Sequence, residues 1–94
     1  MQRDTRFRSA MLTEAINELL SGDLDIGRAM LRDYVNATVT FDVLAKRTSK
    51  PSKSLQRMLG PSGNPVAGSL FAITKVLQDA EHIHLQVQAV KAAA

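Results

Sequence analysis

Most apolar residues of this chain recur three or four positions apart, in runs that are interrupted by glycine, by proline and by one β-branched stretch. Such spacing places side chains on one face of an α-helix, so the runs predict amphipathic helices. The interruptions are Gly22, the stretch NATVT (36–40), Pro51 and the turn-forming segment GPSGNPVAG (60–68). The pattern therefore predicts an all-α fold of about five helices, in a single domain over residues 1–94.

The first two predicted helices lie on either side of Gly22. The first runs from Arg6 to this glycine. The second begins near Asp23 or Asp25, because either carboxylate can accept a hydrogen bond from a free amide of the first helical turn. The residues expected to face inward are Phe7, Met11, Leu12, Ala15, Ile16, Leu19 and Leu20 in the first helix, and Ile26, Ala29, Met30, Leu31, Tyr34 and Val35 in the second.

Residues 40–60 contain two short helical segments on either side of Pro51. The hydroxyl of Thr40 can cap the start of the first segment. Pro51 excludes Lys50 from helical geometry, so the first segment is expected to span about two turns. The residues predicted to pack inward are Phe41, Leu44, Ala45 and Thr48 in the first segment, and Leu55, Met58 and Leu59 in the second.

The last helix is predicted to begin at Val66 or Ser69 and to end at Ala80, with an inward stripe of Leu70, Ile73, Val76, Leu77 and Ala80. Residues 82–89, HIHLQVQA, then alternate polar and apolar side chains, which predicts a short β-strand over about residues 82–90. One isolated strand needs a partner edge. The same strand of a second subunit would supply it most economically; the alternative is that the segment packs one face on the helices and frays.

The charges are distributed unevenly. Six Lys or Arg residues and no Asp or Glu lie within residues 43–78, while the remaining six cations share the rest of the chain with all nine acids. A local positive field suits a polyanion such as nucleic acid, but a solvated basic helix face gives the same count.

Several functional classes lack support in the sequence. There is no cysteine for a disulfide, a thiolate nucleophile or a cysteine-ligated zinc site. His82 and His84 share one strand face, but no further ligand motif completes a metal site, and a solvated or interface face is favoured. No Ser-His-Asp set, paired-carboxylate site or phosphate-binding glycine loop is present, so neither enzymatic activity nor a cofactor is expected. No apolar run approaches a membrane span, and we expect a soluble, cytoplasmic protein.

The two short segments of residues 40–60 match the needs of a DNA-binding helix-turn-helix. Such a unit has a small residue where its helices cross, apolar residues that lock the pair, and polar residues exposed on the second helix. Ala45 is the small residue, and the lock is expected from Leu44, Leu55 and Met58. Arg and Lys can donate to guanine and Gln can pair with adenine, so the predicted base-facing residues are Ser52, Lys53, Gln56 and Arg57. The residues expected beside the DNA backbone are Lys46, Arg47 and Lys50.

The stretches AINELLSGD (15–23) and TFDVLAKRTSKPSKSLQRMLGPSGNPVAGSLFAITKVLQ (40–78) resemble HigA-like addiction-module antidote proteins, which are antitoxins with a lambda-repressor-like (XRE type) helix-turn-helix. The likeness covers about residues 12–87, and its most specific part is a helix ending in Leu59 followed by GPSGNP. The resemblance implies that Ala45 is the crossover residue, that Leu55 is buried, and that the exposed positions are Ser52, Lys53, Ser54, Gln56 and Arg57. It also implies an antitoxin that binds operator DNA, pairs with a RelE/HigB-like ribonuclease toxin and represses its own operon.

The sequence departs from that family at the turn, where Ser49, Lys50 and Pro51 replace a glycine, an apolar residue and a capping serine. Two hypotheses therefore remain. The first is a sequence-specific repressor, a homodimer that presents two recognition helices about 34 Å apart on double-stranded operator DNA. The alternative is a protein-interaction module that neutralises a RelE-like toxin, with weak or no specific DNA binding, through a pair of helices or the C-terminal strand.

The N-terminus offers one further basic feature. Arg3, Arg6 and Arg8 could form an arm that reaches along DNA, although a frayed terminus is the default expectation.

Overall fold

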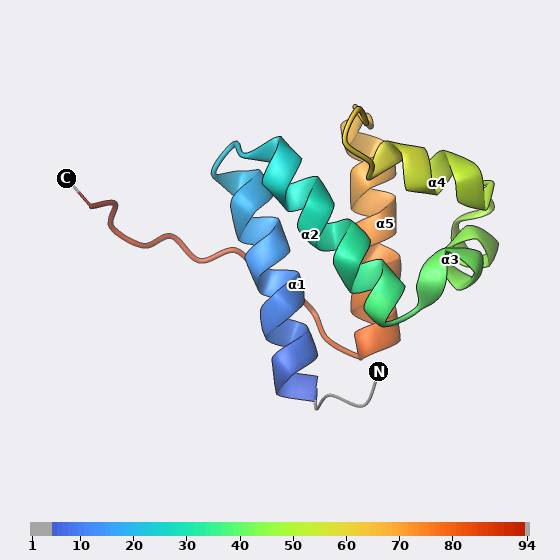
Figure 1. Ribbon diagram of the computed structural model, residues 1–94. Helices are drawn as coiled ribbons and strands as arrows, with labels where there is room; N and C mark the ends of the chain where they lie inside the picture. Colours follow the sequence, from blue (N-terminus) through green and yellow to red (C-terminus); the bar gives the residue numbers. More distant parts are fainter. Residues whose placement is uncertain (1–4, 94) are drawn as a thin grey trace.

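The computed structural model describes residues 5–93, and within them the chain forms five α-helices and no β-strand (Figure 1). The helices are α1 (Thr5–Leu20), α2 (Leu24–Ala37), α3 (Thr40–Thr48), α4 (Ser52–Met58) and α5 (Ala67–Glu81). The predicted all-α architecture and the number of helices are confirmed. None of the helices in residues 5–93 is both long and apolar enough to cross a bilayer.

Helices α1 and α2 form an antiparallel hairpin (Figure 1). The predicted cap is present, since the Asp23 carboxylate accepts a hydrogen bond from the Ile26 N–H at 3.2 Å. The two helices approach closely at Gly27, where a Cβ atom would collide with the side chain of Leu19. A glycine inside a helix costs stability, and here this close approach of the helices offsets the cost.

One hydrophobic core draws side chains from all five helices. Its buried members are Leu12, Ala15, Leu31, Tyr34, Val35, Phe41, Leu44, Leu55, Leu59, Ile73 and Leu77. Three residues predicted to face inward do not: Phe7, Leu20 and Ile26 are 43%, 61% and 49% exposed. They lie in the first or last turn of their helices. The helical period places them on the inward face, but the neighbouring helices cover that face only near the middle of each helix.

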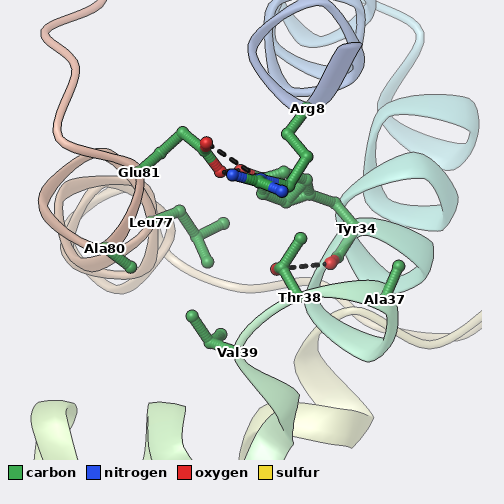
Figure 2. Close-up of a pocket in the computed structure, with 8 residues that line it drawn as sticks. All are labelled: Arg8, Tyr34, Ala37, Thr38, Val39, Leu77, Ala80 and Glu81. Carbon is green, nitrogen blue, oxygen red and sulfur yellow. Dashed lines mark hydrogen bonds and ion pairs between the residues drawn. The ribbon is translucent and has the colours of Figure 1, made fainter. Parts of the chain in front are cut away.

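A buried polar cluster joins three helices at one end of this core (Figure 2). The Arg8 guanidinium of α1 lies 2.9 Å from the Glu81 carboxylate of α5, and the Tyr34 hydroxyl of α2 donates to the same carboxylate at 2.8 Å. Burial, together with the hydrogen bond to Glu81, raises the pKa of Tyr34 above its usual range. The cluster borders a cavity of about 210 Å³ between α1, α2 and α5.

Residues 83–93 follow α5 as an extended segment that runs back past α1 (Figure 1). His82 ends the helix in the left-handed conformation, with φ 57°. Ile83 and Leu85 pack against the core, and the Leu85 N–H donates to the Gln78 side chain at 2.8 Å, whereas Val87 is 77% exposed. Two of the alternating apolar residues, Ile83 and Leu85, therefore face the core. The strand predicted at residues 82–90 would need a neighbouring strand to pair with, and it stays a prediction.

Candidate nucleic-acid interface

Helices α3 and α4 are joined by a tight turn that contains the three departures from the family pattern. Ser49 adopts the left-handed conformation, with φ 57° and ψ 33°, at the position where a glycine was expected. The N–H of Lys50 donates to the Ala45 carbonyl at 3.3 Å, and Pro51 then has extended geometry, with φ −62° and ψ 139°. A serine can adopt the left-handed conformation at a modest cost, so the turn forms without glycine.

The start of α3 carries a second unusual backbone angle. Thr40 has φ 72°, which is rare for a β-branched residue, and its hydroxyl accepts a long hydrogen bond of 3.5 Å from the Val43 N–H. This long contact resembles the predicted cap, but Thr40 is the first residue of α3, and Val39, which precedes it at the cap position, makes no side-chain hydrogen bond to the helix.

The apolar side of α4 is anchored in the core. Leu44 of α3, Leu55 of α4 and Leu59 directly after it are fully buried. Met58 and Ala45 are partly buried and pack against the same cluster. The burial predicted for Leu44 and Leu55 is confirmed, and that of Met58 is confirmed in part. These contacts determine which face of α4 is left to solvent.

The opposite side of α4 carries polar and cationic residues. Lys53, Gln56 and Arg57 are exposed, while Ser52 and Ser54 are half-buried. The Gln56 amide donates to the Ser52 hydroxyl at 3.0 Å, a contact between residues one turn apart that holds the amide over the first turn of the helix. All of the side chains predicted to read bases thus lie on one short helix and off the core.

The cations around this helix form no ion pair within residues 5–93, although Asp42 lies on α3 one turn before Lys46. Lys46 and Arg47 are exposed at the end of α3, and Lys50 is half-buried in the turn. Within residues 5–93 the ion pairs are Arg8 with Glu81, Arg28 with Asp25, and Lys75 with Asp79. Five cations on α3, the turn and α4 take part in none of these ion pairs: Lys46, Arg47, Lys50, Lys53 and Arg57. Their positive field is therefore directed to solvent.

The loop after α4 is held close to the helix. Gly63 donates its N–H to the Gly60 carbonyl at 3.0 Å, and a Cβ atom at Gly63 would collide with the carbonyl oxygen of Met58. An open depression of about 300 Å³ separates the loop from α4 and is lined by Ser54, Arg57, Met58, Ser62, Gly63, Asn64 and Pro65. Gly63, the second glycine of GPSGNP, is needed for this close approach.

Two arginines that the sequence reasoning missed hold the end of α4. Arg32 of α2 donates to the Leu59 carbonyl at 3.1 Å, and Arg28 donates to the Gly60 carbonyl at 3.4 Å. Arg28 is only 7% exposed. The available signal was its position: it lies three residues before the buried Leu31, on the inward face of α2.

The two less favoured features of the sequence, a basic N-terminal arm and a histidine metal site, are not formed by the described residues. Arg6 and Arg8 belong to α1, and Arg8 is bound to Glu81, so they do not form a free basic arm; Arg3 lies outside the described residues. Within residues 5–93 no cluster of three or more His, Cys, Asp or Glu side chains that could hold a metal ion occurs around His82, His84 or elsewhere.

Comparison of the chain with protein-family models, with curated proteins and with solved structures finds no match.

Proposed function

We propose that the chain is a sequence-specific DNA-binding protein in which α3 and α4 form a lambda-repressor-like helix-turn-helix. The observation that carries the proposal is the division of α4 into two sides. Leu55 fixes one side in the core, while Lys53, Gln56 and Arg57 are exposed on the other, and neither cation forms an ion pair within residues 5–93. A helix mounted in this way can enter the major groove with its polar side toward the bases.

The residue types suggest a division of labour. Gln56 can bind adenine through two hydrogen bonds, and Arg57 or Lys53 can donate to guanine. Ser52 and Ser54 can bond to a base or a phosphate. Lys46, Arg47 and Lys50 lie on α3 and in the turn, and their unpaired charges suit the phosphate backbone, where they would add affinity for any sequence.

The biological role that we propose is that of an antitoxin, on the resemblance of residues 12–87 to HigA-like proteins. The protein would repress its own operon and bind a RelE/HigB-like toxin. It would act as a homodimer, because a palindromic operator requires two recognition helices about 34 Å apart.

The extended C-terminal segment supports the dimer. Its exposed Val87 lies beside a groove of about 240 Å³ between α1 and α5, and this groove also contains Leu20 and Phe71, which are 61% and 68% exposed. The segment leaves the helices on the side away from α3 and α4 (Figure 1). A strand formed there with a second subunit would leave both α4 helices free to bind DNA.

The same groove also favours the alternative function. Apolar residues around an extended backbone segment form a surface on which another protein can add a strand. In this reading the chain neutralises a RelE-like toxin as a protein-interaction module, and its specific DNA binding is weak or absent.

A binding titration separates the two functions. The purified protein is titrated with the duplex from upstream of its own gene and with a scrambled duplex of the same composition, each at two salt concentrations. The proposed function requires tight binding to the upstream duplex alone, weakened by salt. Equal and weak binding to both duplexes would refute specific DNA recognition and favour the protein-interaction module.

A further inference from the structure

The C-terminal end of α4 is held by side chains of a different helix. Three consecutive carbonyls close this end, those of Leu59, Gly60 and Pro61. Arg32 donates from Nη1 to the first at 3.1 Å, and Arg28 donates from Nε and Nη2 to the second and third at 3.4 Å each. Both arginines belong to α2.

Arg28 is itself fixed in place. Its Nη2 lies 2.7 Å from the Asp25 carboxylate, and its side chain is 8% exposed. A buried guanidinium with an ion pair on one side and backbone carbonyls on the other has little freedom to move. It therefore acts as a rigid bracket between α2 and the end of α4.

Helix α4 depends on such external support. It has seven residues, and a helix of about two turns is not stable in isolation. The carbonyls that the arginines bind belong to the three residues directly after α4, next to the negative end of the helix dipole, where a guanidinium is favoured. Leu55 and Leu59 fix how deeply α4 sits in the core, but two apolar anchors on one face leave the helix able to pivot about them.

We propose that Arg28 and Arg32 are positioning residues for DNA recognition: they fix the angle at which α4 presents Gln56 and Arg57, and they do so without contacting DNA. This inference rests on the proposed DNA-binding function. The location of Arg32 supports it, because Arg32 and Gln56 border the same depression of about 410 Å³, which α2, α3 and the end of α4 enclose. A shift of the helix end would therefore be felt at Gln56.

The test uses Arg32→Met, which removes the charge and the hydrogen bond but keeps the length of the side chain. Lys91→Met is the matched control, because Lys91 is an exposed cation on the C-terminal segment. Affinities for the upstream and scrambled duplexes are measured at two salt concentrations. We expect Arg32→Met to lower the ratio of the two affinities by about tenfold, the effect of losing one hydrogen bond from a charged group, with binding to the scrambled duplex and its salt dependence unchanged. Arg32→Lys should restore part of the ratio.

Two results would overturn the inference alone. If Arg32→Met weakens binding to both duplexes equally and reduces the salt dependence, Arg32 contacts a phosphate directly. If it binds both duplexes as the wild type does, the bracket has no influence on recognition. Failure of the wild type to distinguish the duplexes would instead refute the proposed function, and the inference would fall with it.

Hydrogen exchange tests the same contact without DNA. Arg32 is chosen for the substitution because it is half-buried, so its replacement carries less risk to folding than that of the buried Arg28. The amides of Leu59 and Gly60 are bonded within the end of α4, to the carbonyls of Leu55 and Arg57. In Arg32→Met they should exchange faster, whereas the amides of α5 should not change. Unchanged protection at the end of α4 would show that the arginine does not hold it.

Discussion

Arg8 of α1 and Arg57 of α4 are both arginines on helices that contribute leucine to the core, but their surroundings differ. The Nε of Arg8 lies 2.9 Å from a Glu81 carboxylate, which is itself 8% exposed and also bound by Tyr34. Arg57 is exposed and has no ion pair within residues 5–93. A guanidinium bound by an internal carboxylate stabilises the fold but is not available to a phosphate or a base, whereas an unpaired one is available.

The comparison extends to the two parts of the molecule. The end of the bundle where α1, α2 and α5 meet has a buried polar cluster whose groups satisfy one another, and there the charge serves stability. Helices α3 and α4 are held mainly by Leu44, Leu55 and Leu59, and their charges face solvent. Substitutions in the first part should therefore change folding and leave DNA affinity alone, while substitutions on the exposed side of α4 should do the reverse.

The largest effect is expected from Leu55→Ala, which would cost about 2 to 5 kcal/mol of unfolding free energy because it leaves a cavity at a fully buried site. Urea denaturation measures this loss. Val66→Ala is the control, since Val66 is 71% exposed and its truncation should cost less than about 0.5 kcal/mol. Equal stability of Leu55→Ala and the wild type would show that α4 is not mounted through this residue.

The exposed side of α4 should show the opposite behaviour. Gln56→Ala and Arg57→Ala should each weaken binding to the upstream duplex by about 1 to 3 kcal/mol, the value of a good contact between a side chain and a base edge. Their urea unfolding curves should match that of the wild type. A Gln56→Ala, Arg57→Ala double variant that binds the upstream duplex as tightly as the wild type would contradict the assignment of α4 as the recognition helix.

Tyr34→Phe tests the buried cluster. The hydroxyl donates to a buried carboxylate, so its removal should cost about 1.5 to 3 kcal/mol of unfolding free energy and leave DNA affinity unchanged. Reduced affinity for the upstream duplex in this variant would show that the two parts of the molecule are coupled.

The raised pKa of Tyr34 adds a dependence on pH. Since folding favours the neutral phenol, this contribution to stability is fully present below the unfolded pKa of about 10 and is lost as pH rises above it. The chain has one tyrosine and no tryptophan, so the absorbance of tyrosinate follows this residue alone. The folded protein should titrate at higher pH than the urea-unfolded chain; coincident titrations would disprove the burial of the hydroxyl.

The smallest change is expected from Lys46→Ala. It should lower affinity for the upstream and scrambled duplexes alike and reduce the slope of log affinity against log salt by about one, because the proposed function gives Lys46 one phosphate contact. Lys91→Ala removes an equivalent exposed charge from the C-terminal segment and should leave the slope unchanged. A loss confined to the upstream duplex would instead assign Lys46 to base recognition.

Helical spacing and local breakers were sufficient to predict the elements. Asp23 caps α2, Pro51 separates α3 from α4, and α5 ends within one residue of the predicted Ala80. The exposed side of α4 could also be predicted, because a buried Leu55 determines by helical geometry that Gln56 and Arg57 point elsewhere. These are local properties, fixed by residues within a few positions of one another.

The sequence by itself determined where the helices begin and end and which side of α4 is polar, because propensity and periodicity act over one or two turns. Only the tertiary structure decided which helix ends are left uncovered, as at Leu20 and Ile26, and which charges are paired. Arg8 and Glu81 are 73 residues apart, and Arg32 lies 27 residues before the carbonyl it binds. Such contacts depend on how helices pack in space, and no local pattern encodes that packing.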